Sequence, residues 1–147
     1  MPTGHTGQVS SSFIKELFLF YFMATKQILS KAFFGKDNCL KVYLNDELDC
    51  YFEFGTPKTK GESGWNWKPV KFNDSELGEM IGVLEGRKDS VSFFHDFKGG
   101  KTQIWIRKNA DKFSIKVREL AKGLNFGEQM VLKELLSHII VRKSLKF

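Results

Sequence analysis

The sequence predicts an α+β fold, in which antiparallel β-sheets carry helices on one side and are open on the other. Two observations predict this class. Segments in which apolar and polar residues alternate, typical of strands, occur in two groups of three, and each group precedes a segment whose apolar residues have helical spacing. Hydrophobic residues make up 41% of the 147-residue chain, which is enough for one hydrophobic core and one domain.

The N-terminal region is predicted to lie outside the folded domain. Residues 1–22 are predicted to be a disordered or weakly helical extension, and residues 23–35 an N-terminal helix that stops before Gly35. The apolar run 17–24 is far short of the roughly 20 residues that a membrane-spanning helix needs, so we expect no membrane partner. Two alternatives stay open for this region, an organellar presequence and a native start at Met23.

Residues 36–147 are predicted to form the folded domain. Its first three strands show apolar residues at every second position, and they are 40–44, 50–54 and 65–72. Pro69 places the third of them at a sheet edge or a bulge, because proline cannot donate a ladder hydrogen bond. Asn73 and Glu76 then form a capping-box pattern, which predicts a helix that ends at Gly86.

The second half of the domain repeats this plan. Its three predicted strands are 90–97, 102–108 and 112–118. Asn125 and Glu128 make a second capping-box pattern, and the apolar residues from Leu132 to Ile139 give one face of a longer helix. The chain is therefore predicted to be an internal β-β-β-α duplication in pattern, without direct sequence identity between its halves.

The charge of the chain favours a polyanionic partner. Lys and Arg outnumber Asp and Glu by 23 to 17, the formal net charge is +6, and the pI is about 9.3. Nucleic acid and an anionic membrane surface are the two classes of partner that such a balance favours. The alternative is that the excess charge only supports solubility.

The last two predicted strands separate an apolar face from a basic one. Because side chains alternate between the faces of a strand, Ile104 and Ile106 point to one side while Trp105 and Arg107 point to the other. The segment 98–118 contains seven basic residues and one acid. A basic sheet face that carries an indole suits single-stranded nucleic acid, since cations follow the phosphates while the ring stacks on an unpaired base.

These patterns predict a set of nucleic-acid-binding residues on strands and their loops. Trp65 and Trp67 share a face among lysines, and the pattern allows them either to extend the stacking surface or to belong to a core or subunit contact. Phe52, Phe54, Phe93 and Phe94 are assigned to the core. The predicted binding residues are Lys58, Lys60, Trp65, Trp67, Lys68, Lys98, Lys101, Gln103, Trp105, Arg107, Lys108, Lys112, Lys116 and Arg118.

Other chemistry is not indicated. Cys39 and Cys50 are too few for a disulfide scaffold and are expected to be buried free thiols. The three histidines share no metal-ligand spacing with them, so we expect no metal and no cofactor. The His95-Asp96 pair would diverge to opposite faces of a strand, and the segment 98–101 lacks a phosphate-loop pattern, so we expect no enzyme.

Several short segments resemble the central motifs of the Whirly proteins, a family of single-stranded DNA-binding proteins related in fold to the coactivator positive cofactor four. In order and spacing, the similar segments are Phe52-Glu53-Phe54, Trp67, Lys71-Phe72, Ser75-Glu76-Leu77-Gly78 and Ser92-Phe93-Phe94-His95-Asp96. The resemblance covers roughly residues 36–142. The family's Lys-Gly-Lys-Ala-Ala-Leu motif is not present, the nearest stretch being 36–44, so the sequence does not predict higher-order assembly.

The resemblance implies two antiparallel four-stranded sheets packed with helices, so one strand in each predicted repeat is missing or shifted. It also implies a homotetramer assembled through the helical side, with a dimer as the alternative, and single-stranded DNA bound with little sequence preference. Related folds bind guide RNA in kinetoplastid mitochondria, so RNA is an alternative ligand. An archaeal single-strand-binding family of similar design is an alternative relative.

The resulting hypothesis is a single-stranded DNA-binding protein that acts in DNA maintenance, replication, repair or transcription. Its alternatives are an RNA-binding protein of similar fold and an oligomeric, transcription-associated interaction protein. The sequence leaves the compartment open between the cytoplasm or nucleoid and an organelle.

Overall fold

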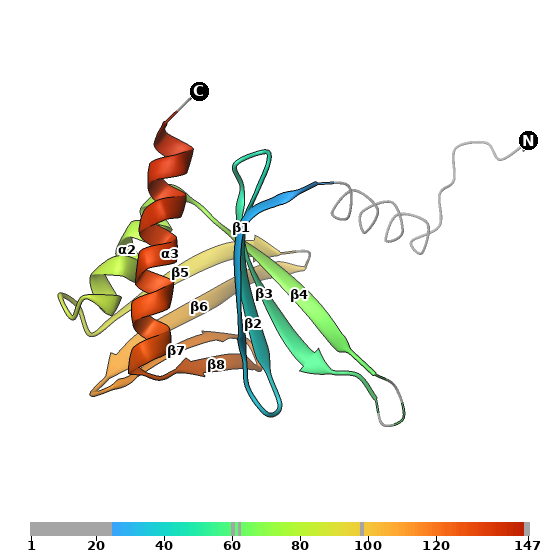
Figure 1. Cartoon of the computed structure of the whole chain (residues 1–147). Helices are drawn as coiled ribbons and strands as arrows, with labels where there is room; N and C mark the ends of the chain where they lie inside the picture. Colours follow the sequence, from blue (N-terminus) through green and yellow to red (C-terminus); the bar gives the residue numbers. More distant parts are fainter. Residues whose placement is uncertain (1–24, 60, 62, 98, 146–147) are drawn as a thin grey trace, which may run out of the picture.

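In the residues that the structure describes, the protein forms two four-stranded antiparallel sheets, each followed by a helix (Figure 1). This architecture comes from a computed structural model, which describes residues 25–59, 61, 63–97 and 99–145. The first sheet has the order β1-β2-β3-β4 and the second the order β5-β6-β7-β8. The elements are β1 (Gln27–Phe34), β2 (Cys39–Asn45), β3 (Cys50–Pro57), β4 (Trp65–Phe72), α2 (Asp74–Leu84), β5 (Ser90–Phe97), β6 (Gly100–Asn109), β7 (Lys112–Val117), β8 (Leu120–Leu124) and α3 (Phe126–Ser144).

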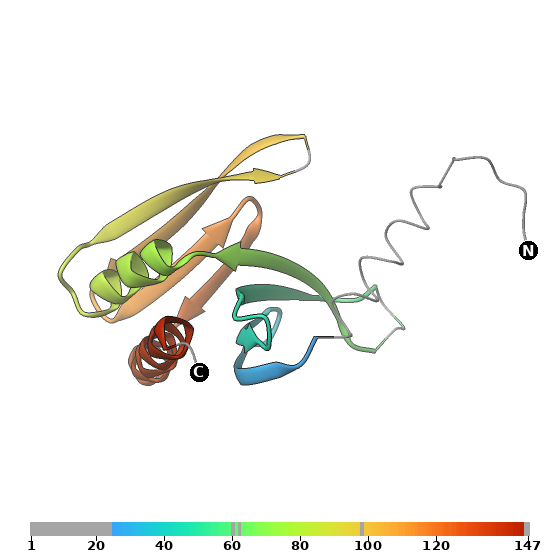
Figure 2. The same ribbon diagram turned by 90° about the horizontal axis from the view of Figure 1, so that it is seen from above.

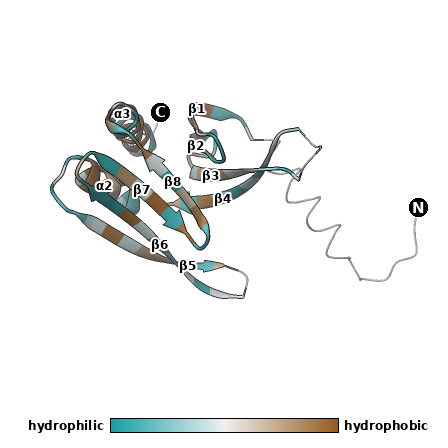
Figure 3. Ribbon diagram, turned by 90° about the horizontal axis from the view of Figure 1, so that it is seen from below, coloured by the Kyte–Doolittle hydropathy of each residue, from teal (hydrophilic) through white to brown (hydrophobic). Residues whose placement is uncertain are grey.

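The predicted α+β class is confirmed, with the helices on one face of the sheets. Helices α2 and α3 pack side by side, α2 against β5 and β6, and α3 against β1, β7 and β8 (Figures 1 and 2). Helix α3 therefore contacts both sheets. Figure 3 shows the alternation of apolar and polar residues along the strands, which gives each sheet one face for the helices and one face without them.

One hydrophobic core fills the space between the sheets and the helices. From the first sheet it takes Phe52 and Phe72, whose rings meet edge to face with centroids 4.8 Å apart. From the second sheet it takes Ile104, Ile106 and other residues of the same face. The predicted core positions Phe52 and Phe54 are buried, and Phe93 packs against the core, so these three assignments are confirmed.

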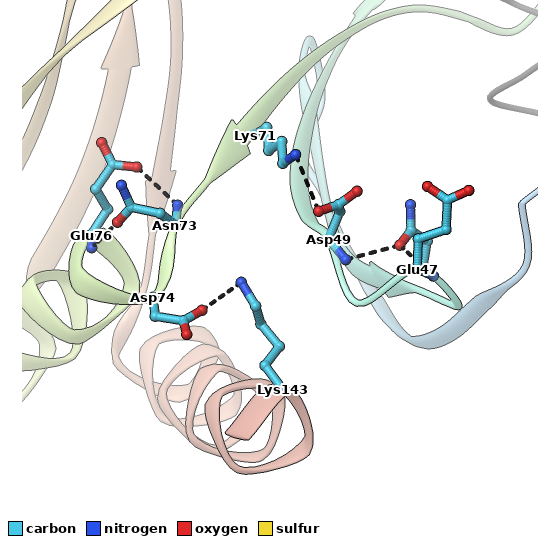
Figure 4. Close-up of polar contacts among 8 residues, drawn as sticks. Glu47, Asp49, Lys71, Asn73, Asp74, Glu76 and Lys143 are labelled. Atoms are coloured by element: carbon cyan, nitrogen blue, oxygen red, sulfur yellow. Dashed lines mark hydrogen bonds and ion pairs between the residues drawn. The ribbon is translucent and has the colours of Figure 1, made fainter. Parts of the chain in front are cut away.

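Both helices begin as their sequences predict. In α2 the Asn73 side chain accepts a hydrogen bond from the Glu76 amide, while the Glu76 carboxylate accepts one from the Asn73 amide (Figure 4). Asn125 and Glu128 repeat this reciprocal capping at α3. Two of the amide groups that a helix start leaves unpaired are satisfied in this way at each helix.

The predicted helix over residues 23–35 is wrong where the structure describes it. Residues Gln27–Phe34 form strand β1, which pairs antiparallel with β2. The ambiguity has a physical cause, because Leu29 and Phe33 are four residues apart and share a face in a strand as well as in a helix. The folded domain therefore starts before residue 36. The predictions for residues 1–22 lie outside the described residues.

Strand β8, like β1, is missing from the sequence prediction, because its alternation of apolar and polar residues is weak. Its inward positions are Leu120, Lys122 and Leu124, so a lysine interrupts the apolar series, and Gly123 weakens the strand signal. Lys122 is nevertheless buried. With β1 and β8 added, each half of the chain is a β-β-β-β-α unit. Pro69 lies in β4, an edge strand, as its lack of an amide proton predicts.

The two cysteines are buried free thiols, as expected. Cys50 pairs with Leu44 on the helix-covered face of the first sheet, whereas Cys39 pairs with Gly55 near the opposite end of the strands. Burial raises the pKa of the Cys50 thiol to about 12, and burial also raises the pKa of the Cys39 thiol. Both thiols therefore stay protonated at neutral pH.

Candidate nucleic-acid interface

The outer face of the second sheet, on the side away from the helices, brings an exposed indole together with basic side chains. In the register of β5, β6, β7 and β8, Trp105 lies between Ser92 and Lys116, and Lys116 lies next to Ala121. The next row places Arg107 between Ser90 and Ser114. Small neighbours thus surround the large side chains, which stand out from the sheet. We call this surface the Trp105 face, and its residues are Phe94, Lys101, Gln103, Trp105, Arg107, Lys112 and Lys116.

Two aromatic rings of this face are open to solvent. Trp105 is 51% exposed and Phe94 is 65% exposed. The assignment of Phe94 to the core is therefore wrong. The alternation along β5 predicts this exposure, because Phe94 is in phase with Ser90, Ser92 and Asp96, which are all polar. An exposed phenylalanine next to an exposed tryptophan gives this face two rings on which unpaired bases can stack.

The cations of the Trp105 face are free to meet phosphates. Lys101, Arg107, Lys112 and Lys116 are all exposed. In the part of the chain that the structure describes, none of these four side chains forms an ion pair. Other cations do, such as Lys71 with Asp49 and Lys133 with Glu85. The only carboxylate on the described part of this face is that of Asp96, across from Lys101. The surface is therefore basic in its net charge.

Gln103 lies on the same face of β6 as Trp105, two residues before it. It is half-buried, it pairs with Phe94 across β5 and β6, and its Nε2 donates to Ser92 Oγ over 3.2 Å. The amide is thus held in place beside Trp105. Gln103 thus lies on the outer face of β6, as alternation predicts, and its part in binding stays a prediction.

Two predicted phosphate contacts, Lys108 and Arg118, form hydrogen bonds with other parts of the fold. Lys108 is in phase with Ile104 and Ile106, and its Nζ donates to the Leu84 carbonyl over 3.0 Å, at the end of α2. Arg118 follows β7 with a φ of 56°, and its guanidinium donates twice to Thr102 Oγ1, over 3.0 and 2.8 Å.

The guanidinium of Arg118 also lies over the Phe97 ring, 5.7 Å from its centroid. Thr102 is a buried residue of the helix-covered face. The assignment of Lys108 and Arg118 to the basic outer face is therefore corrected. Alternation sends Lys108 inward, and the left-handed turn residue Arg118 leaves the phase of β7.

The other predicted tryptophans lie on the first sheet. Trp65 and Trp67 point to its outer face together with Phe34, and they are not part of the Trp105 face. Lys68 pairs with Phe54 and belongs to the opposite face of β4, although it is exposed. Lys58 is exposed at the end of β3, while Lys60 and Lys98 lie outside the described residues.

His95 has a structural partner and faces away from Asp96, as alternation predicts. Its Nε2 lies 2.6 Å from Oε2 of Glu76, and both side chains are largely buried. Phe72 packs against the imidazole with a centroid distance of 5.3 Å. In the described residues, no cluster of three or more His, Cys, Asp or Glu side chains could hold a metal ion. Among the helices described, none is long and apolar enough to cross a membrane.

Comparison with known proteins shows the fold and no family. No family model and no curated protein matches the sequence. Solved structures do show similarity, two of them with a TM-score of 0.65. One is described as crystal structures of Trypanosoma brucei MRP1/MRP2, with a TM-score of 0.65 and 13% identity, and it covers 93% of this chain and 97% of that one.

The other is described as a guide-RNA-binding protein complex bound to a guide RNA. Its TM-score is 0.65 and its identity 14%, over 83% of this chain and 95% of the other. At such identities the likeness establishes that the arrangement of strands and helices is shared. The resemblance to the Whirly family stays a prediction.

Proposed function

We propose that this protein binds single-stranded nucleic acid through the Trp105 face, with RNA preferred over DNA and with little sequence specificity. The observation that carries the proposal is the row formed by Trp105 and Lys116, in which a 51% exposed indole stands beside an unpaired cation and between small residues. Stacking on an aromatic ring is tolerant of sequence because every base has a π-face.

The preference for RNA is supported by the solved structures of similar fold, of which one is a guide-RNA-binding complex. This preference departs from the sequence hypothesis, which puts single-stranded DNA first and RNA second. The chemistry of the face suits both ligands, since rings and cations recognise bases and phosphates in either strand.

A homo-oligomer is proposed as the binding unit, as the family resemblance implies. Helix α3 exposes Phe126, Val131 and Val141, and Phe126 is exposed to 59%. Apolar residues on the outside of a helix are typical of a surface that another chain covers. A native mass equal to a dimer or tetramer supports this assembly, and a monomer contradicts it.

The test of function is direct binding by the purified protein. Fluorescein-labelled uridine and deoxythymidine oligomers of equal length are titrated with wild-type protein and with the Trp105→Ala variant. A stacked base contributes about 1–3 kcal/mol, so the variant is expected to bind the uridine oligomer at least about tenfold more weakly. The wild type should bind uridine more tightly than deoxythymidine.

Ile28→Ala is the control, because it shortens an exposed apolar side chain that belongs neither to the Trp105 face nor to the exposed apolar residues of α3. It should leave the affinity unchanged. Equal affinity for both oligomers would contradict the RNA preference. An unchanged affinity of the Trp105→Ala variant would contradict the assignment of the binding face.

A further inference from the structure

The first sheet carries its own group of aromatic rings on its outer face, formed by the exposed Phe34 and Trp67 and the half-buried Trp65. The centroids of Phe34 and Trp65 are 6.3 Å apart, and those of Trp65 and Trp67 are 6.4 Å apart. Phe34 is 66% exposed and Trp67 is 37% exposed. We call this group the Phe34 cluster. It lies on the outer face of the first sheet and comes from β1 and β4, the two edge strands.

The backbone of the sheet holds the Trp67 ring in a defined place. Trp67 pairs with Gly55, and a β-carbon at Gly55 would lie only 2.9 Å from Cζ3 of that indole. The ring therefore covers Gly55 and lies against β3, and the Trp67 side chain stays partly exposed. The absence of a side chain at Gly55 makes room for this arrangement. A flat ring that is supported from below is a rigid platform for a planar ligand.

Basic residues lie at the same end of the first sheet. Lys36 is in the turn after β1 and Lys58 follows β3, and both are exposed. In the described residues neither forms an ion pair, and Asp37 is the acid of the adjoining turn. At this end of the sheet, β3 and β4 run away from the helices (Figure 1). Cations beside exposed rings suit a single strand of nucleic acid, because the cations can bind phosphates while bases stack on the rings.

We infer that the Phe34 cluster is a second base-stacking site for single-stranded RNA, separate from the Trp105 face. The inference rests on the proposed function and extends it, because one chain then holds two stacking surfaces on two different sheets. Two sites on one chain raise the affinity for a strand that reaches both of them, since the second contact becomes intramolecular.

The three tryptophans of the chain allow each site to be observed separately. In a Trp105→Phe variant the first site keeps an aromatic ring, and all remaining indole emission comes from Trp65 and Trp67. Stacking of a base on an indole quenches its emission. Titration of this variant with a uridine oligomer is expected to quench the remaining emission in a saturable manner.

A second variant, Gly55→Ala, displaces the Trp67 ring without removing it. Gly55 has no left-handed backbone conformation, so alanine fits the strand and only the ring has to move. We expect Gly55→Ala to weaken binding and Trp67→Ala to weaken it by about tenfold. Ile28→Ala serves again as the control, and its affinity should equal that of the wild type.

The outcomes separate this inference from the proposed function. If the uridine oligomer quenches the wild type but not the Trp105→Phe variant, the second site is overturned and the first stands. If it quenches neither protein and binds neither, the proposed function fails as well. If the emission of Trp65 and Trp67 changes with protein concentration alone, the cluster is a contact between copies of the chain, and the second site is again overturned.

Discussion

The Nε2 atom of His95 lies 2.6 Å from Oε2 of Glu76, so a strand of the second sheet is tied to the first turn of α2. The other carboxylate oxygen of Glu76, Oε1, accepts the hydrogen bond from the Asn73 amide that completes the capping box. One carboxylate thus caps a helix and fixes a strand. This contact joins two of the segments that resemble the Whirly motifs, and it gives them a structural role in this chain.

Glu76→Ala is therefore expected to destabilise the protein more than an ordinary loss of a helix cap. A cap is worth about 1 kcal/mol, and a largely buried hydrogen bond to a charged group adds about 1.5–3 kcal/mol. The free energy of unfolding in urea measures the loss. Glu128→Ala is the matched control, because Glu128 caps α3 in the same way without a histidine partner among the described residues. Equal losses for the two variants would show that His95 contributes nothing.

The alternation rule accounts for most of the Trp105 face. Sequence alone predicts that Trp105, Arg107 and Lys116 lie on one side of the second sheet, and the strand register confirms those positions. The rule applies where residues stay in phase within a strand. Arg118 lies beyond the end of β7, where a turn residue with positive φ changes the direction of the side chain.

Long-range packing is not predictable in the same way. The hydrogen bond from Lys108 to Leu84 and the contact of α3 with both sheets depend on how distant segments meet. Phe34 falls within the predicted N-terminal helix, because the apolar residues around it have a spacing that fits both a helix and a strand. Its contact with Trp65 joins distant strands and cannot be predicted from local sequence. Local pattern thus predicts faces, whereas pairing between strands decides which faces carry aromatic clusters.

Stability is predicted to fall at alkaline pH. Burial raises the pKa of the Cys50 thiol to about 12. The pKa of Tyr43 is raised mainly by burial and, to a lesser extent, by a hydrogen bond to Glu53. Because these folded-state pKa values lie above those of the unfolded chain, the stabilisation is complete below about pH 8.5 and is lost as the pH rises toward 12. Each unit of pKa difference corresponds to about 1.4 kcal/mol.

The measurement is the free energy of unfolding between about pH 8 and 11, since the cysteine thiol of an unfolded chain titrates near 8.5. Cys50→Ala is expected to lower stability at pH 8 through the cavity it creates, yet to reduce the slope of stability against pH. A slope equal to that of the wild type would mean that the Cys50 thiol does not contribute to the alkaline loss. Comparing slopes rather than absolute values removes the effect of the cavity.

Two lysines of neighbouring strands separate binding from folding. Lys116 is an exposed residue of the Trp105 face, whereas Lys108 donates to the carbonyl of Leu84 at the end of α2. Each phosphate neutralised on a single strand adds about 0.7 to the slope of log affinity against log salt. Lys116→Ala should therefore reduce that slope for a uridine oligomer by about 0.7 and leave the free energy of unfolding unchanged.

Lys108→Ala is the matched variant and should behave in the opposite way. It removes a cation and a hydrogen-bond donor from a helix C-terminus, so the free energy of unfolding should fall by about 1 kcal/mol. The salt slope should stay equal to that of the wild type. Fluorescence anisotropy at several salt concentrations and urea denaturation give both quantities for both variants. If Lys108→Ala lowered the salt slope as much as Lys116→Ala, the strand would have to contact the helix-covered side of β6, and the assignment of the ligand to the outer face would be wrong.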